Sequence, residues 1–203
     1  MRARPLVLAA TGLALTALLT ACGSGTTSTT TTTPAAGSTA NAVGDTADVS
    51  FAQLMIPHHQ QAVAMADLAL KYGSSAEVKK LAAQIEKAQG PEIAQMSGWL
   101  QAWGAPLTMP SSTSSDGMAG MDMGGASADG MMSTKDMDAL AMARGAEFDR
   151  MWLQMMIAHH QGAITMANQV LATTKNAEVT QLAKAIVTGQ TAEIDTMKKL
   201  LAG

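Results

Sequence analysis

Four histidines, arranged as two adjacent pairs, are the residues of this sequence best suited to chemistry. The sequence contains no other histidine, and a methionine lies three residues before and seven residues after the first histidine of each pair. The histidines are His58, His59, His159 and His160, and the methionines are Met55, Met65, Met156 and Met166. Imidazole is a ligand for copper and zinc, and thioether sulfur selects Cu(I). This combination predicts a metal site.

Helical spacing limits how these ligands can combine. His58 and Met65 fall on the same helical face but about 10 Å apart along the axis, so one ion is not expected to bridge them within one helix. A site would combine His58 or His59 with Met55, or with groups from the second copy of the motif. Periodicity places His58 near the centre of the buried face and His59 on its flank. On the other interpretation, His58 and His159 are structural core residues and the methionines fill the core.

A second group of methionines lies among Gly, Ser and Asp residues that cannot form a core. These are Met118, Met121 and Met123, followed by Met131 and Met132. Their spacing resembles thioether clusters of extracytoplasmic copper-handling proteins and predicts a loop that wraps sulfur atoms around Cu(I). The alternative is a low-complexity linker. The only cysteine, Cys22, lies near the N-terminus, so a folded domain has no thiolate ligand and no disulfide.

Acidic residues recur at equivalent places around both histidine pairs. Asp48 and Asp149 lie ten residues before each pair, where a carboxylate can cap a helix or accept a hydrogen bond from a metal-bound imidazole. Glu92 and Glu193 follow later and could reach the interior. A ferritin-like di-iron site requires Glu-x-x-His motifs, and the sequence contains none. We therefore expect a binding protein and not an enzyme.

The two histidine pairs belong to an internal repeat. Asp48–Leu100 aligns with Asp149–Leu201 without a gap, at a shift of 101 residues. The chain is 47% hydrophobic but only 3% aromatic, a composition that favours helices over strands. Each copy is predicted to form a helix hairpin, and two hairpins can bury their apolar faces around a pseudo-twofold axis. The expected fold is an all-α, ferritin-like four-helix bundle, whose link between the copies is long enough for a crossover.

Turn and cap residues set the expected helix boundaries in the first copy. The first helix should run from Asp48 to a turn at residues 72–75, with a kink or a restart at Pro57. A serine of that turn should cap the second helix, which should end near Trp103 with a disturbance at residues 90–91. In the second copy, we expect one helix from about residue 135 to 173 and a last helix capped by Asn176.

The N-terminal segment has the features of an export signal. In residues 1–21, Arg2 and Arg4 precede an apolar run that is too short for a stable transmembrane helix. The run ends in Leu19-Thr20-Ala21-Cys22, which resembles a bacterial lipobox and implies cleavage before Cys22 and diacylation of its thiol. We therefore expect a lipid-anchored protein on the extracytoplasmic face of the cell membrane. The net charge of −3 gives no reason to expect nucleic acid binding.

These segments predict the organisation of the whole chain. A signal peptide (1–21) and a disordered Ser/Thr/Gly-rich tether (22–44) precede a helical domain (45–203). The domain divides into a first copy (48–103), a Met/Gly-rich loop (104–134) and a second copy (135–203).

The motif itself resembles a known family. The pattern Asp48-x-x-Phe51-x-x-x-Met55-Ile56-Pro57-His58-His59-Gln60-x-Ala62-x-x-Met65 is similar to that of DUF305 proteins. In the second copy Trp152 replaces Phe51 and Ala158 replaces Pro57. The resemblance implies a bacterial secreted or lipid-anchored protein with a ferritin-like helical fold, in a family with members implicated in copper binding and tolerance.

Two functions of different classes follow from the sequence. The first is copper sequestration, buffering or transfer, with Cu(I) favoured and zinc or Cu(II) as the alternatives. The second is an interaction module of the cell envelope with structural histidines and no metal. The sequence does not name a protein partner.

Overall fold

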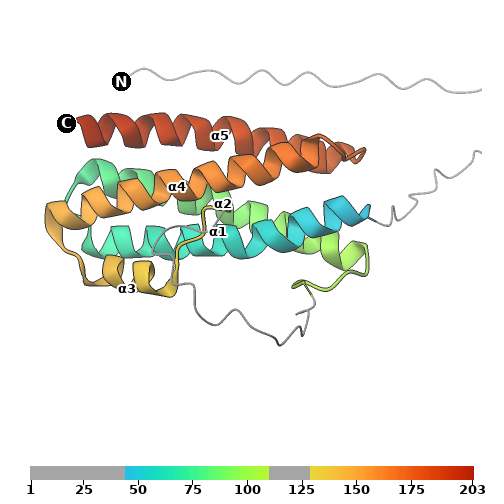
Figure 1. Cartoon of the computed structure of the whole chain (residues 1–203), viewed down its shortest axis with the longest axis horizontal. Helices are drawn as coiled ribbons and strands as arrows, with labels where there is room; N and C mark the ends of the chain where they lie inside the picture. The colour runs from blue at the N-terminus through green and yellow to red at the C-terminus, as the bar shows by residue number, and fades with distance from the viewer. Residues whose placement is uncertain (1–43, 110–128) are drawn as a thin grey trace, which may run out of the picture. The chain divides into compact units, whose positions relative to one another are not determined.

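The computed structural model describes residues 44–109 and 129–203, and within these ranges the chain forms five helices and no strand (Figure 1). The helices are α1 (Thr46–Tyr72), α2 (Ala76–Ala102), α3 (Thr134–Met142), α4 (Gly145–Leu171) and α5 (Ala177–Ala202). The four long helices make a bundle and α3 is a short addition, so the expected all-α four-helix fold is confirmed. None of the described helices has the length and apolar character needed to cross a bilayer.

The predicted caps are present at two helix starts. The side chain of Ser75 accepts a hydrogen bond from the backbone N–H of Val78 at the start of α2. The side chain of Asn176 accepts hydrogen bonds from Glu178 and Val179 at the start of α5. These bonds occupy amide groups that have no partner within the helix, and they fix where each helix begins.

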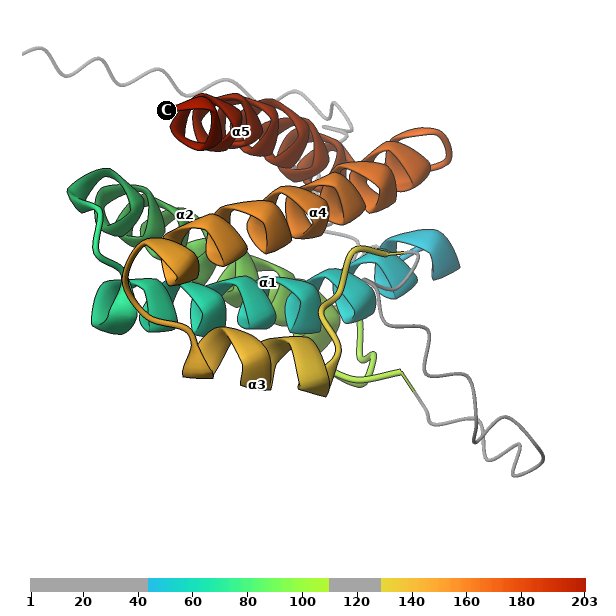
Figure 2. The same cartoon turned by 60° about the vertical axis from the view of Figure 1, so that its left-hand side comes forward.

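The single helix expected from residue 135 to 173 is wrong. The chain forms α3, leaves the helical conformation at Ala143 and Arg144, and begins α4 at Gly145. Gly145 has a φ of +61°, a left-handed conformation that glycine adopts at little cost. The break lets α3 fold back against α1 and α4, outside the bundle of long helices (Figure 2).

The restart of the helix that was one of the two expectations at Pro57 is absent. Pro57 lies inside α1 and Pro91 inside α2, and both helices continue through them. A proline removes one backbone hydrogen bond, but packing on two neighbours holds a long helix together across it.

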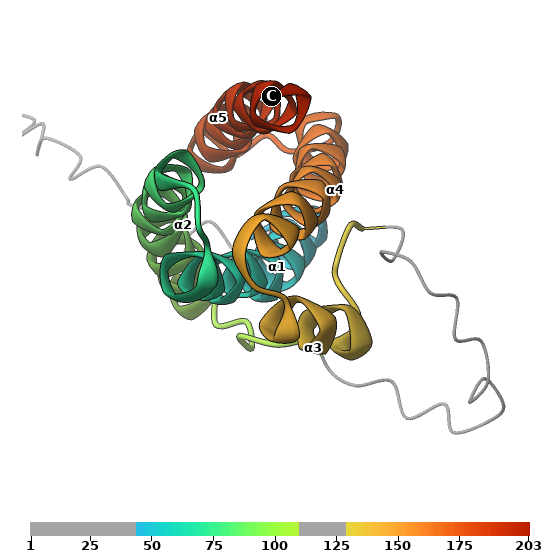
Figure 3. The same cartoon turned by 90° about the vertical axis from the view of Figure 1, so that its left-hand side faces the viewer.

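The order of the helices around the bundle is that of a crossover fold. Viewed end-on, α1 lies beside α2 and α4, and α5 lies beside α4 and α2 (Figure 3). Helix α4 runs antiparallel to α1 and parallel to α2, which is diagonally opposite (Figures 1 and 3). The link from α2 to α4 must therefore return along the bundle, as in the ferritin-like connection that the sequence predicted.

Two apolar clusters form the core, and a layer of polar residues separates them along the bundle. One cluster includes Met65, Met156 and Trp152, whose indole Nε1 donates a hydrogen bond to the Met65 carbonyl at 2.9 Å. The other cluster includes Met55 and Met166. This division follows from the antiparallel crossing of α1 and α4, which pairs the first half of one helix with the second half of the other.

Candidate metal centre

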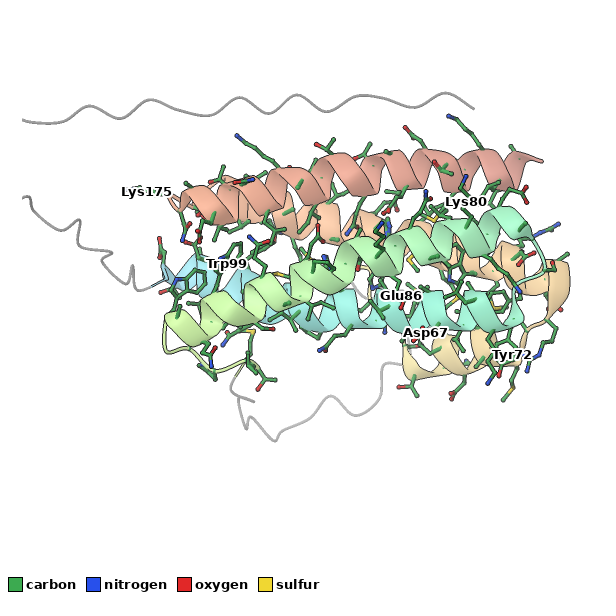
Figure 4. The ribbon with its side chains drawn as sticks, turned by 180° about the vertical axis from the view of Figure 1, so that it is seen from behind. Asp67, Tyr72, Lys80, Glu86, Trp99 and Lys175 are labelled. Atoms are coloured by element: carbon green, nitrogen blue, oxygen red, sulfur yellow. The ribbon has the colours of Figure 1, made fainter. Side chains whose placement is uncertain are left out.

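The polar layer between the two apolar clusters contains two residues from each long helix. Its members are His58 and His59 of α1, Gln89 and Glu92 of α2, His159 and His160 of α4, and Gln190 and Glu193 of α5. The four histidines are at most 1% exposed, whereas charged residues such as Asp67, Lys80 and Glu86 lie on the outer faces (Figure 4). A buried layer of this polarity costs stability unless its groups are paired or bind a ligand.

The first histidines of the two pairs meet at the contact between α1 and α4. The ring centroids of His58 and His159 are 3.7 Å apart, with an angle of 38° between the ring planes. Within each pair the rings are farther apart: 6.5 Å for His58 and His59, and 6.4 Å for His159 and His160. The matching distances reflect the pseudo-twofold arrangement of the bundle.

The second histidine of each pair faces the other helix of its own hairpin. His59 Nε2 donates to Glu92 Oε2 at 2.7 Å, and His160 Nε2 donates to Glu193 Oε2 at 2.8 Å. The sequence placed His59 on the flank of the buried face, but it is fully buried because α1 packs against α2 as well as α4. A carboxylate in this position fixes the tautomer and orientation of an imidazole, as partners of metal-bound histidines do.

Sequence reasoning did not pair these glutamates with the histidines. A signal was available, because both glutamates follow the second histidine of their pair by 33 residues.

Most of the imidazole nitrogens have no hydrogen-bond partner. His58 Nε2 donates to the Asp129 carbonyl at 2.9 Å, which leaves Nδ1 as the lone-pair nitrogen of the neutral ring. Within the described residues, Nδ1 of all four histidines and Nε2 of His159 lack a partner. Both side-chain polar atoms of Gln89 and the Oε1 atom of Gln190 are also buried and unpaired. The layer therefore offers several nitrogen and oxygen atoms to a ligand.

Burial keeps His58 and His159 neutral. It lowers the pKa of His58 to about 4, an effect that the Asp129 carbonyl partly opposes and the neighbouring His59 adds to. Burial, followed by the proximity of His58, lowers the pKa of His159 well below its usual value. Neutral imidazole is the form that coordinates metal ions.

The predicted methionine ligands lie on both sides of the histidine layer. Met65 and Met156 belong to the apolar cluster on one side, and Met55 and Met166 to the cluster on the other; all four are buried. The remaining predicted residues, Met118, Met121, Met123 and the lipidation site Cys22, lie outside the described residues.

The linker that carries these loop methionines is held to α1 at both ends. Before it, Gln53 Nε2 donates to the Pro106 carbonyl at 2.7 Å; after it, Gln61 exchanges two hydrogen bonds with the backbone of Met132. Gln53 and Gln61 lie on either side of His58 in α1.

Within the described residues, neither Asp48 nor Asp149 forms a hydrogen bond with an imidazole, in contrast to the two glutamates. The Asp149 carboxylate accepts hydrogen bonds from the backbone N–H groups of Ser74 (3.0 Å) and Ser75 (2.8 Å) and from the Ser74 hydroxyl. It therefore supports the start of α2, in the other hairpin. Asp48 is buried, and its Oδ1 atom has no partner among the described residues.

The comparison with protein families identifies the family. The family model DUF305, described as a domain of unknown function, matches residues 48–201 of this chain. This chain belongs to the DUF305 family. No protein with curated function matches it.

Solved structures of DUF305 proteins superpose on the chain. A DUF305 fragment from Deinococcus radiodurans has a TM-score of 0.67 and 32% identity, covering 78% of this chain and 97% of the other. A DUF305 protein from Streptomyces coelicolor has a TM-score of 0.66 and 33% identity, covering 77% of this chain and 92% of the other. Another similar structure is CopM in its Cu(I)-bound form, with a TM-score of 0.61, 36% identity and coverage of 75% and 94%. CopM has also been solved with Cu(II), with silver and in an apo form.

The histidine layer of this DUF305 chain would have to rearrange to bind a metal ion between its two copies. In the two described ranges, no three His, Cys, Asp or Glu side chains converge as ligands of one ion. An ion bound to two imidazoles at about 2.0 Å would hold the ring centroids about 5–6 Å apart, farther than the 3.7 Å between His58 and His159. These rings must therefore separate to share an ion, or each must bind one together with a thioether.

Proposed function

We propose that this DUF305 protein binds copper in the polar layer of its bundle, with Cu(I) favoured, and that it buffers, sequesters or passes on the ion. The observation that carries the proposal is the set of four buried imidazoles, each of which has at least one nitrogen without a hydrogen-bond partner among the described residues. Buried polar groups are rarely left unpaired, so a ligand is the economical explanation for several of them in one layer.

The neighbouring carboxylates and sulfur atoms support copper as that ligand. Glu92 and Glu193 orient His59 and His160 as outer partners orient metal-bound imidazoles. Buried thioethers flank the histidine layer on both sides, and they favour Cu(I) over harder ions. The similar protein CopM, solved with Cu(I), Cu(II) and silver, adds support from a relative at 36% identity. Zinc and Cu(II) remain the alternative ions.

We propose that the loop methionines capture the ion before the bundle does. Met118, Met121 and Met123 lie in a linker whose two ends are held to α1 on either side of His58. The two ends of the linker are fixed to α1, and a donor on a tether passes on its ligand at a higher effective concentration than a free donor does.

We further propose that the protein is lipid-anchored at Cys22 on the extracytoplasmic face of the membrane. This proposal rests on the lipobox-like end of the N-terminal apolar run. The function we propose there is binding without catalysis, because the histidine layer is closed to solvent and has no Glu-x-x-His ligands.

The test is a competition titration with Cu(I) and a colorimetric chelator. We would compare the protein with a His58→Gln/His159→Gln variant and with a variant carrying serine at Met118, Met121 and Met123. Tight binding that the histidine variant loses would assign the ion to the bundle, and loss in the serine variant would assign it to the linker. If the unmodified protein did not compete with the chelator, the Cu(I) proposal would fail and Cu(II) and zinc would be titrated next.

Two observations favour the second candidate, an interaction module without metal. The close contact of the His58 and His159 rings and the glutamate partners of the other two histidines are also what structural histidines would show. This candidate predicts that the histidine variant lowers the melting temperature while copper, zinc and silver change the melting temperature of neither protein.

A further inference from the structure

A short segment covers the outer edge of the histidine pair. It consists of Asp129–Met132, here called the strap, and it precedes α3 and lies along the outside of α1 and α4 (yellow in Figures 2 and 3). The carbonyl of Asp129 accepts the hydrogen bond from His58 Nε2. The outer edge of His58 thus faces the strap and not solvent.

The strap lies directly on the backbone of α4. A Cβ atom on Gly162 would overlap the carbonyl of Asp129 and would lie 2.8 Å from the nitrogen of Gly130. Gly130 itself has a φ of +79°, and a Cβ there would lie 2.5 Å from the carbonyl oxygen of Ala158. Glycine at both positions is what allows the two backbones to approach this closely.

A side chain of α1 holds the other end of the strap. Gln61 Nε2 donates to the Met132 carbonyl at 2.9 Å, and the Met132 backbone N–H donates to Gln61 Oε1 at 2.7 Å. The amide side chain thus satisfies both polar groups of one backbone residue, as a neighbouring strand would.

The repeat departs from its own pattern where the strap lies. Gln61 and Gly162 occupy equivalent positions, 101 residues apart, three residues after His58 and His159 respectively. In α1, Gln61 supplies the hydrogen-bond donor and acceptor that hold Met132 of the strap. In α4, Gly162 has no side chain and so leaves room for Asp129 of the strap. The difference between the two copies therefore has a structural cause.

We propose that the strap controls the exchange of ions at the His58–His159 pair and that Gln61 and Gly162 are the residues that position it. This inference rests on the proposed copper function. In this proposal, the route of an ion from solvent to Nδ1 of His58 passes the Nε2 edge that the strap covers. A short segment without regular secondary structure can open while the long helices stay packed.

The hydrogen bond from His58 to the strap also leaves a nitrogen of the ring available for the ion while the strap is closed. Since Asp129 accepts the Nε2 proton, Nδ1 remains the nitrogen that can coordinate, and the strap can close again over a loaded site. Weakening the strap should therefore accelerate uptake and release by the same factor and leave the affinity unchanged.

The test compares two alanine substitutions in the middle of helices. Gly162→Ala inserts a Cβ where the strap lies, whereas Gly189→Ala in α5 inserts one that meets nothing within 4 Å. Both substitutions replace glycine by alanine within a helix and so gain the same helix propensity. A difference in exchange rate between the two variants therefore reports on the strap. Gln61→Ala serves as a second variant that removes the two hydrogen bonds without steric conflict. All are made in the full-length protein, in detergent, with serine at the three loop methionines to confine the ion to the bundle.

Two measurements are made on each variant. The first is the rate of Cu(I) uptake and of Cu(I) release to a chelator, by stopped flow. The second is the rate at which diethyl pyrocarbonate modifies His58 in the metal-free protein, by peptide mass mapping. We expect all three rates to rise about tenfold in Gly162→Ala and Gln61→Ala, with affinity unchanged, and to stay at the parent value in Gly189→Ala.

The outcomes separate this inference from the proposed function. Unchanged rates in both strap variants would overturn the role of the strap, as would a loss of affinity in place of faster exchange. If the parent protein bound no copper but His58 reacted faster in the strap variants, the copper function would fall and control of access to the pair would stand.

Discussion

The two aspartates that precede the histidine pairs are equivalent in sequence but should differ sharply in their effect on stability. Asp149 receives three hydrogen bonds from the turn between α1 and α2, and Asp48 has an unpaired buried oxygen atom. We expect Asp149→Ala to be strongly destabilising and Asp48→Ala to be nearly neutral.

The magnitude follows from the partners that Asp149 would leave behind. Hydrogen bonds to a charged group contribute about 1.5–3 kcal/mol each, but Ser74 is exposed and Ser75 is half-buried, so water would replace part of the loss. We therefore expect Asp149→Ala to lower the free energy of unfolding by about 2–4 kcal/mol. For a chain of this length the melting temperature would fall by roughly 5–15 °C. Asp48→Ala should change the free energy of unfolding by less than about 1 kcal/mol, since it removes a buried oxygen without a partner.

Urea unfolding of the metal-free protein, followed by circular dichroism at neutral pH, measures both values. Ser74→Ala is a useful third variant, because it removes only the hydroxyl donor and should cost less than half of the Asp149→Ala effect. Equal losses for the two aspartate variants, or a larger loss for Asp48→Ala, would refute the assignment of Asp149 as the group that supports α2.

Three further predictions concern the polar layer. Because the pKa of His58 is lowered to about 4, the unfolded chain takes up a proton at this residue below about pH 6.5 that the folded chain does not; metal-free stability should therefore fall by up to about 3 kcal/mol as the pH is lowered from 6.5 to 4. Urea unfolding at pH 7 and pH 4.5 checks this, and His58→Gln should reduce the dependence, whose remainder comes from His159 with its lowered pKa; a stability that rose on acidification would contradict the prediction. Gln89→Met should raise the free energy of unfolding by about 1–2 kcal/mol, since it removes two buried unpaired amide atoms at similar volume, and Gln190→Met should raise it by less, since only its Oε1 atom is unpaired; a lower melting temperature for both variants would show that the amides have partners. Cu(I) at a hundredfold excess over its dissociation constant should stabilise the protein by about 2.7 kcal/mol in a thermal melt, and His58→Gln/His159→Gln should abolish the shift.

The sequence predicted a helix boundary well where the boundary is set by contacts between neighbouring residues. The caps at Ser75 and Asn176 were predicted and are present, because a cap is a contact between residues two or three positions apart. The break before Gly145 was missed because glycine is tolerated inside helices, and only the packing of α3 on α1 and α4 shows that this one adopts a left-handed conformation.

The sequence by itself determined the all-α class, the paired hairpins and the concentration of every histidine in two equivalent motifs. These follow from composition, periodicity and repetition, which act over a few turns of helix. The tertiary structure alone decided that the ring of His58 contacts that of His159, that Glu92 accepts a hydrogen bond from His59, and that equivalent aspartates have different surroundings. It also decided that Gln61 and Gly162 hold the strap over the histidine pair. These contacts join residues 33 to 75 positions apart, or facing copies of the repeat, and their geometry depends on how four helices pack together.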